Sequence, residues 1–380
     1  MPIFDQGYQH WSGKLSGHTW RWLAISRQGI RAALKKRWMR QVTFLAWVPA
    51  LMLAAILCGW GLLERKSSSV TVFLQYLTFV DPRVRADPKH YRNVIWTLSY
   101  SYFLASELRF AMFMMIGAVA SLISLDLRFN ALPLYFSRPI RKIDYFIGKL
   151  GIIGGLLGMI MILPAVLAYI LGLLFSLDWT ILSDTFHLLL GAVAYGVIIT
   201  LSAGTLLLAL SAMSRNSRYV ALLWVGIWVM SGIIGTVMEG VDRDQRRNAY
   251  VRAEMERDQL DMQSIRQRGA SPEEWQARRH ALLEARNDFD AVELESAKKD
   301  WRPMVSYTGN LTRVGEELLG TRAAWQTLAE LDPPDAQSRF MMDFAGPQYP
   351  WKWSAIVLAG LFVVSTCTMN IPVKSLDRLK

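Results

Sequence analysis

Six runs of mostly apolar residues constrain this chain more than any other feature of its sequence. They cover residues 42–63, 106–125, 147–175, 186–212, 219–239 and 353–372. A helix needs about 20 consecutive apolar residues to cross the hydrocarbon core of a bilayer. Because 52% of the residues are hydrophobic and fall mainly into these runs, the sequence predicts an all-α membrane protein with six transmembrane helices. We expect the second helix to begin near Glu107 and Arg109, because charged side chains are costly to bury in a membrane.

Basic residues indicate the orientation of these helices. Lys and Arg are concentrated before the first run, in the loop 126–149, at Arg215 and Arg218, and after residue 373. If all six runs cross, these segments lie on one side, and the positive-inside rule makes that side cytoplasmic. We therefore expect both termini in the cytoplasm. The same pattern accounts for the net charge of +11 without nucleic-acid binding.

The charged segment between the last two runs predicts a helical hairpin outside the cytoplasm. Two sets of apolar residues each recur at helical spacing. The first is Val251, Met255, Met262 and Ile265, and the second is Trp275, Leu282, Phe289 and Val292. Between them, helix stop and start signals occur at Gly269, Ser271, Pro272 and Glu274. The hairpin is either a solvated spacer or a docking surface for a partner protein or the substrate. The later prolines Pro333, Pro334, Pro347 and Pro350 predict irregular structure leading back to the membrane.

The segment before the first run predicts an amphipathic helix that lies in the headgroup layer. Leu23, Ile30, Leu34 and Trp38 can share one face, and Arg27, Arg31 and Lys35 form a cationic stripe. Trp22 and Trp38 are suited to the membrane interface, and the basic residues to anionic lipid. This helix either anchors the chain to lipid or docks onto a cytoplasmic subunit.

Motifs for catalysis, metal binding and nucleotide binding are absent from the sequence. The histidines are scattered, and the chain contains no H-E-x-x-H, C-x-x-C, G-x-S-x-G or P-loop pattern. Cys58 and Cys367 both fall inside apolar runs. We therefore expect no catalytic residue, no metal site and no cofactor held by this chain.

Small residues near the start of the third run favour close helix packing. Gly151 and Gly155 are four residues apart, as are Gly154 and Gly158. This spacing lets two helix backbones approach closely. The contact could lie within the subunit, at a dimer interface or at a moving surface.

The loop after the second run carries a family resemblance. The order Asp126, Arg128 and then "ALPLYFSRPIRKIDYFIGKL" resembles the cytoplasmic loop of ABC transporter permeases of the type-2 export superfamily. Asn130-Ala131 stands where that family usually has Gly-Thr, and Pro133 is unusual. The N-terminal amphipathic helix, "SAMSRNSRYVALLW" and "NIPVKSLDRLK" are similar to the family's connecting helix, its next cytoplasmic loop and its basic tail. The charged hairpin departs from the short external loop of most members.

The resemblance implies a permease subunit in a bacterial inner membrane. Its partners would be a second permease copy or a paralogue and two separate cytoplasmic ATPase subunits, which would bind the ATP and Mg. The chain itself would not be an enzyme. The expected contacts with the ATPase are Asp126, Arg128, Pro139, Arg141, Lys142, Tyr145 and Lys149, and the loop 126–149 is called the coupling loop below.

On this basis the chain divides into four parts: the cytoplasmic N-terminus 1–41, the five helices and coupling loop 42–239, the extracytoplasmic domain 240–352, and the last helix with its tail 353–380. A different class of function stays open. The chain could be a membrane-anchored scaffold or receptor whose external hairpin binds a partner protein.

Overall fold

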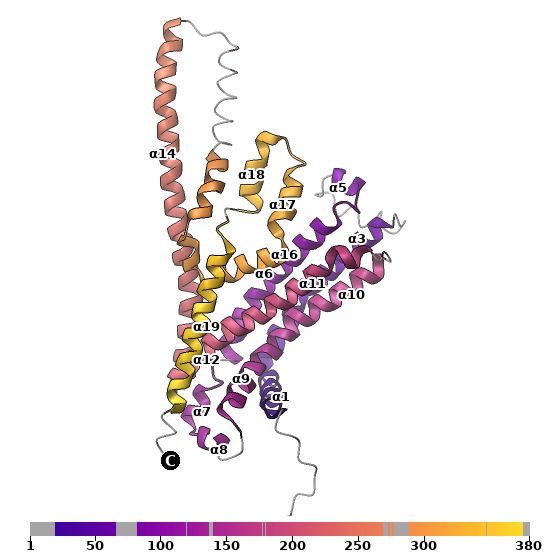
Figure 1. The fold of residues 1–380 in the computed structure, drawn as a ribbon, viewed down its shortest axis with the longest axis vertical. Helices are drawn as coiled ribbons and strands as arrows, with labels where there is room; N and C mark the ends of the chain where they lie inside the picture. The colour runs from indigo at the N-terminus through magenta and orange to yellow at the C-terminus, as the bar shows by residue number, and fades with distance from the viewer. Residues whose placement is uncertain are drawn as a thin grey trace, which may run out of the picture.

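The computed structural model of this chain is helical throughout the residues that it describes. These are residues 20–65, 82–118, 120–136, 140–176, 178, 180–268, 273, 276, 289–346 and 348–374. Within them no strand forms. Long helical segments run between the two ends of the molecule and pack around one large apolar core (Figure 1).

The first helices form the N-terminal half of the bundle. Their bounds are α1 Arg21–Leu34, α2 Arg37–Leu45, α3 Trp47–Glu64, α5 Pro82–Ala86, α6 Arg92–Ala118, α7 Ser124–Arg128 and α8 Leu132–Phe136. α9 Lys142–Leu157 and α10 Leu163–Ser176 form one long segment, joined by the π-helical turn η2 Gly158–Ile162.

The later segments return through the bundle and leave it. α11 Thr180–Ile199 and α12 Thr205–Met213 are joined by the π-helical turn η3 Thr200–Gly204, and α13 Ser217–Val225 and α14 Ser231–Arg268 by η4 Gly226–Met230. The remaining elements are the short 3-10 helices η5 Ala297–Lys299 and η6 Arg302–Val305, then α16 Tyr307–Leu319, α17 Thr321–Ala329, α18 Pro334–Phe344 and α19 Trp351–Lys374.

Five of these segments are long and apolar enough to cross a membrane. Among the described residues they are Arg37–Glu64, Lys142–Ser176, Thr180–Met213, Ser217–Ala253 and Trp351–Met369. By length and composition, the chain is therefore a multi-pass membrane protein.

The helix α6 differs from the expected second span. It begins at Arg92 rather than near Glu107, so Glu107 and Arg109 lie in its middle. The helical turns before Glu107 pack into the bundle. Tyr100 lies in one of them, and its buried hydroxyl donates to the carbonyl of Ala165 on α10 at 2.9 Å. Arg109 is exposed, whereas Glu107 is buried and neither of its oxygens has a hydrogen-bond partner. Tertiary packing, rather than mean hydropathy, sets the length of this helix.

The predicted N-terminal amphipathic helix is two helices. α1 ends at Leu34, a turn follows at Lys35 and Lys36, and α2 leads into α3 with only Ala46 between them. Ile30 and Leu34 of the predicted apolar face pack against the core, but the face is wrong for its other two residues. Leu23 is exposed, and Trp38 belongs to α2, where its ring lies against Gly117 of α6.

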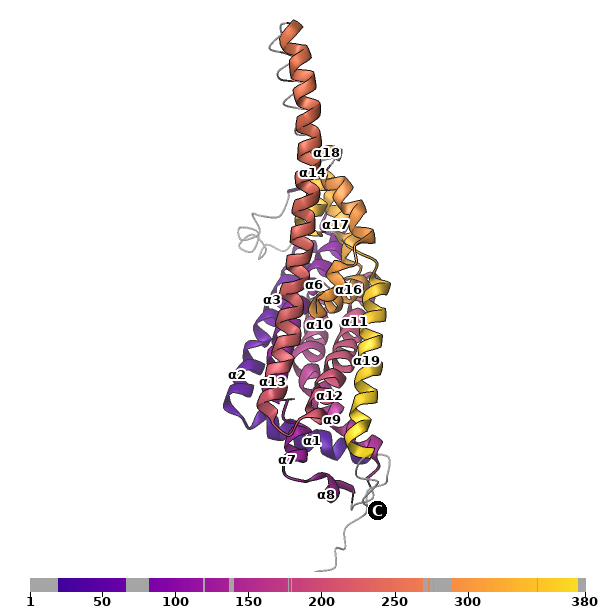
Figure 2. The same ribbon diagram turned by 90° about the vertical axis from the view of Figure 1, so that its left-hand side faces the viewer.

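The fourth membrane-length segment, Ser217–Ala253, does not end where the external domain was expected to begin at residue 240. Its helix continues through α14 to Arg268 and projects beyond the rest of the molecule (Figure 2). The predicted turn residues Gly269, Ser271, Pro272 and Glu274 lie outside the described residues.

Near its base, α14 contacts the segment 289–300, which runs back toward the bundle. The rings of Tyr250 and Phe289 are 5.3 Å apart, and Arg246 lies 2.9 Å from Oε1 of Glu293. Val251 and Val292, which were predicted to face the partner helix, are both exposed. The assignment of these two valines to the contact face is therefore wrong, whereas Phe289 lies on this face as predicted.

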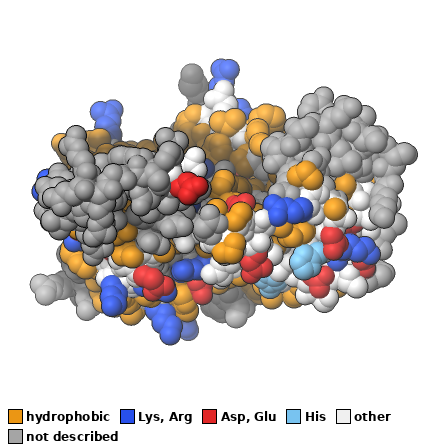
Figure 3. Space-filling view, turned by 90° about the horizontal axis from the view of Figure 1, so that it is seen from above, with side chains coloured by type: hydrophobic (Ala, Val, Ile, Leu, Met, Phe, Trp, Pro, Cys, Tyr) orange, Lys and Arg blue, Asp and Glu red, His pale blue; other side chains and the backbone are white. Residues whose placement is uncertain are grey.

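The region between α14 and α19 also contains helices that the prolines had not indicated. α16, α17 and α18 occupy residues 307–344, and Pro334 takes the first position of α18, where a missing N–H costs no hydrogen bond. Seen from the end at which α14 projects, acidic, basic and apolar side chains are intermixed (Figure 3).

A charge cluster ties four helices together at this end. Arg92 of α6 donates to both carboxylate oxygens of Glu64 on α3, at 2.8 and 2.7 Å. It also lies 3.1 Å from Asp178 and 3.2 Å from Asp184 on α11. Ser176 at the end of α10 donates to Glu64 at 3.1 Å. The arrangement satisfies a buried guanidinium and fixes the helix ends in register.

Candidate functional site

The coupling loop forms two short helices at the end of the bundle opposite the one from which α14 projects (Figure 1). α7 ends in a turn at Asn130, whose φ of 52° is left-handed. The amide of Ala131 donates to the carbonyl of Asp126 at 2.8 Å and closes this turn. Because Asn tolerates the left-handed region better than other side chains, Asn130 can occupy the position where the resembling family has Gly.

Ser211 of α12 holds the start of α7. Its hydroxyl accepts hydrogen bonds from the amides of Ile123 and Ser124, at 3.1 and 2.9 Å, and donates to the carbonyl of Ala120 at 3.1 Å. The N-terminal amides of a helix have no partner within that helix. A side chain from another helix therefore supplies the cap here, and α7 is fixed to α12.

Asp126, Tyr145 and Lys149 form a second attachment, between α7 and α9. The Tyr145 hydroxyl donates to Oδ2 of Asp126 at 2.7 Å, and Nζ of Lys149 lies 2.7 Å from the same oxygen. Lys149 also donates to the carbonyl of Leu122 at 2.7 Å. Tyr145 and Lys149 are buried. These three predicted contact residues therefore bond to one another inside the chain.

Tyr135 of α8 covers this cluster. Its ring meets that of Tyr145 edge to face with centroids 5.3 Å apart, and Nζ of Lys149 lies 5.8 Å from the Tyr135 centroid. Burial, together with the negative charge of Asp126, raises the pKa of Tyr135. Tyr135 thus packs against residues of its own chain.

The exposed side chains of the coupling loop include basic residues as well as the apolar Phe129 and Ile143, which are 71% and 62% exposed. Arg128 and Arg141 are exposed and Lys142 is half-buried. Arg141 precedes α9, and its amide donates to the carboxylate of Asp144 at 3.1 Å, which caps the helix. Pro139 lies outside the described residues.

A basic depression adjoins α7. Its volume is about 410 Å³, and we call it the arginine depression; its lining residues are Arg128, Arg215, Asn216, Ser217 and Arg218. Arg128 comes from the coupling loop, and the other four residues come from the start of α13. The depression therefore joins two basic segments that are far apart in the sequence.

Two of the predicted packing glycines, Gly151 and Gly155, contact α1. A Cβ atom at Gly151 would lie 2.3 Å from Oγ of Ser26, and one at Gly155 would lie 2.3 Å from Cδ1 of Ile30. Gly148, one turn earlier, has the same role, because its Cβ would meet Ile25 at 2.8 Å and its carbonyl accepts from Ser26 at 2.9 Å. These glycines let α1 lie directly on the backbone of α9.

The other two predicted glycines lie away from α1. A Cβ atom at Gly154 would meet Thr200 of η3 at 3.2 Å, whereas one at Gly158 would meet no atom within 4 Å.

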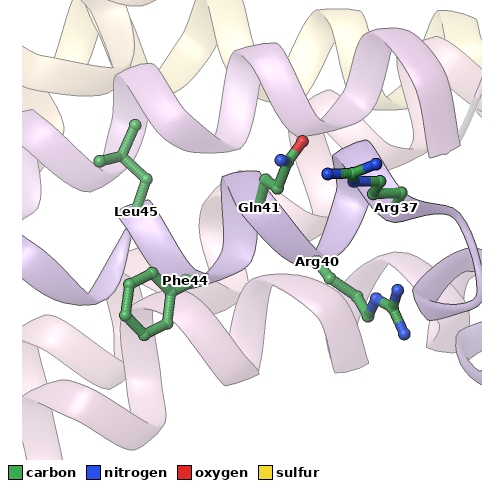
Figure 4. Close-up of a pocket in the computed structure, with 5 residues that line it drawn as sticks. All are labelled: Arg37, Arg40, Gln41, Phe44 and Leu45. Carbon is green, nitrogen blue, oxygen red and sulfur yellow. The ribbon is translucent and has the colours of Figure 1, made fainter.

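The basic face of the N-terminal helices is open. Arg27, Arg31 and Lys35 are exposed, and Trp22 is half-buried against α9 beside Gly151. On α2, a shallow cavity of about 510 Å³ is lined by Arg37, Arg40, Gln41, Phe44 and Leu45. Figure 4 shows the two arginines toward the start of α2 and the two apolar side chains toward its end. This order along the axis suits a helix that enters a membrane from its headgroup layer.

Two groups of residues in these clusters had not been singled out from the sequence. Ser211 gave no signal, because a serine in an apolar run is typical of many membrane helices. Glu64 stands directly after an apolar run, where charge is expected in any case, and Arg92 lies between two runs. Only the three-dimensional arrangement shows that each one holds several helices.

The described residues contain no group of three His, Cys, Asp or Glu side chains that could hold a metal ion. In comparisons with known proteins, no family model, curated protein or solved structure matches this chain.

Proposed function

We propose that this chain is the permease subunit of an ATP-driven exporter in a bacterial inner membrane. It pairs with a second permease copy or a paralogue, and with two separate ATPase subunits. The observation that carries the proposal is the double attachment of α7: to α12 through Ser211, and to α9 through Asp126. A force applied to the coupling loop therefore reaches two membrane-length segments without first bending the loop.

In this proposal α6 is the sixth crossing. Its 27 residues extend about 40 Å at 1.5 Å per residue, which exceeds the thickness of the hydrocarbon core. It runs beside α3 and α11. With six crossings, both termini lie on the side of the coupling loop, and the basic flanks make this side cytoplasmic.

The ATPase subunits contact the exposed basic side chains of the coupling loop and of α1. Arg128, Arg141 and Lys142 supply positive charge at the loop, and the stripe Arg27, Arg31 and Lys35 extends it along α1. Arg and Lys recognise carboxylates through charge-assisted hydrogen bonds. Closure of the ATPases then shifts the packed segments between two arrangements.

Co-purification tests this proposal. The full chain, purified with the proteins it binds, should bring a nucleotide-hydrolysing subunit. Charge reversal in Arg141→Glu/Lys142→Glu should release that subunit while the chain still inserts into the membrane. A matched control is Arg247→Glu/Arg252→Glu, which reverses the same number of basic charges on α14. Unchanged association in the first variant, or the lack of any such subunit with the wild-type chain, would contradict the proposal.

A second function is favoured by one observation: the length of α14 beyond the bundle (Figure 2). A rigid projecting helix can present a surface to a partner protein, and the chain would then be a membrane-anchored scaffold or receptor. The same co-purification separates the two functions, because a scaffold would retain a partner through α14 and would bring no ATPase.

A further inference from the structure

We propose that the arginine depression binds the phosphate headgroup of an anionic phospholipid. This inference goes beyond the exporter function and concerns a different ligand from the ATPase. It rests on the charges that line the depression, on their position at the end of a membrane-length segment, and on the apolar surface beside them.

The depression concentrates positive charge. Three of its five lining residues are arginines, and none is acidic. Within the described part of the chain, none of the three guanidinium groups forms an ion pair with a carboxylate. Like charges held together repel, and a phosphate relieves this repulsion while accepting several N–H hydrogen bonds at once.

The guanidinium groups, rather than the backbone amides at the start of α13, are the main donors available to an anion in this depression. The amide of Arg218 already donates to the side chain of Asn216 at 3.1 Å, and the amide of Asn216 donates to Ser214 at 3.1 Å. Local side chains thus satisfy two of the backbone donors at the start of α13. Binding of an anion therefore depends mainly on the arginine side chains.

The position of the depression matches the headgroup layer of a bilayer. Arg215 and Arg218 lie at the start of the membrane-length segment Ser217–Ala253. Basic residues at this level are attracted to anionic lipid headgroups. A cavity of about 410 Å³ is within the usual size range of a small-molecule site.

Apolar side chains beside the depression favour a lipid over a soluble anion. Tyr219, Leu222 and Leu223 follow Arg218 on α13 and are 62%, 68% and 53% exposed. Their spacing of three and four residues places them on one outward face. Acyl chains that extend from a bound phosphate would cover this face, whereas free phosphate or a sugar phosphate would leave it uncovered.

The test uses the purified full chain in a neutral detergent, without the ATPase. Native mass spectrometry would measure binding of dioctanoyl phosphatidylglycerol, with dioctanoyl phosphatidylcholine as the uncharged comparison and glycerol 3-phosphate as the soluble anion. Each arginine near a membrane surface contributes about a fivefold gain in affinity, so Arg215→Gln/Arg218→Gln should weaken binding of phosphatidylglycerol about 30-fold. The matched control, Arg247→Gln/Arg252→Gln, removes two exposed charges at the other end of the same long segment and should bind normally.

Arg128→Gln provides a second variant on a separate element, in case the double variant does not fold, and should weaken binding about fivefold. Glycerol 3-phosphate at the same concentration should not displace the lipid. Equal binding of the two phospholipids, wild-type affinity in the variants, or displacement by glycerol 3-phosphate would overturn the proposal. In a separate co-purification, a double variant that keeps its lipid but no longer brings the ATPase would also overturn it, because the depression would then be a protein contact.

Discussion

The Nζ atom of Lys149 lies 2.7 Å from Oδ2 of Asp126, and the hydroxyl of Tyr145 donates to the same oxygen at 2.7 Å. One carboxylate oxygen on α7 thus joins two side chains that are one helical turn apart on α9. Lys149 is buried, and Asp126 is its ion-pair partner. The contact holds the coupling loop in place rather than offering these residues to another protein.

The Asp126 contact predicts a loss of stability in the variant Asp126→Asn. Removing one partner of a buried pair leaves the other charge uncompensated, so the free energy of unfolding should fall by about 3 kcal/mol. Tyr145→Phe removes only one hydrogen bond and should cost about 1 kcal/mol. Thermal unfolding of the purified chain measures both. A variant Asp126→Asn that is as stable as the wild type but releases the ATPase would show instead that Asp126 touches the partner.

The seating of α1 on α9 predicts different outcomes for two Gly-to-Ala changes in the same long segment. Gly148→Ala should displace α1, because its Cβ would clash with Cβ of Ile25 and approach the carbonyl of Trp22 to 3.1 Å. Gly158→Ala should have little effect, since no atom lies within 4 Å of its Cβ position. Trypsin cleavage after Arg27 and Arg31 reports on the displacement. Equal cleavage in the two variants would contradict the observed packing of α1.

The charge cluster at the other end predicts that Arg92 contributes far more to stability than a neighbouring surface cation. Arg92→Gln leaves Glu64 buried without its bidentate partner and should lower the free energy of unfolding by about 3 kcal/mol. Lys89→Gln removes an ion pair of 3.5 Å whose cation is 65% exposed, and should cost less than about 1 kcal/mol. Similar melting temperatures for the two variants would mean that the cluster does not hold the helices.

Asp178 in the same cluster predicts a dependence of stability on pH. Hydrogen bonds from Thr180, and then the guanidinium of Arg92, hold the pKa of Asp178 well below its ordinary value of 3.8. The folded chain therefore binds fewer protons at this site than the unfolded chain when the pH is near that value. The stabilisation is fully present above about pH 3.8 and is lost as the pH falls below it.

The variant Asp178→Asn checks this sign. Its melting temperature should be lower than that of the wild type at neutral pH, and the difference should shrink as the pH falls below about 3.8. A difference that grows toward acid pH would mean that the carboxyl group is favoured in its protonated form.

The base of α14 predicts which residue pair faces the returning segment. Cysteines introduced in place of Tyr250 and Phe289 should react rapidly with a short thiol crosslinker, because the native rings are 5.3 Å apart. Cysteines in place of Val251 and Val292 should react slowly with each other, since both side chains point to the surface. The experiment needs Cys58→Ser/Cys367→Ser as its background. Faster crosslinking of the valine pair would restore the register expected from the sequence.

The sequence by itself determined that this chain is suited to a membrane and that it is helical. Long apolar runs such as 147–175 and 186–212 contain enough hydrophobic residues for a crossing, whatever their neighbours are, because the bilayer requires length and apolarity only. The basic loop after the second run could also be recognised from its residues. Local composition is therefore sufficient to predict membrane-length apolar helices and basic loops, because both depend mainly on whether a segment faces lipid or water.

Only the tertiary structure decided which side chains are joined and where helices begin and end. In the sequence, Asp126 and Lys149 cannot be distinguished from other charged residues of the coupling loop. In the structure these two form an ion pair inside the chain, whereas Arg128 and Arg141 are exposed. In the same way α6 begins at Arg92 because Glu64, Asp178 and Asp184 surround its guanidinium. These outcomes depend on contacts between helices far apart in the chain, and such contacts have no signature in local hydropathy or spacing.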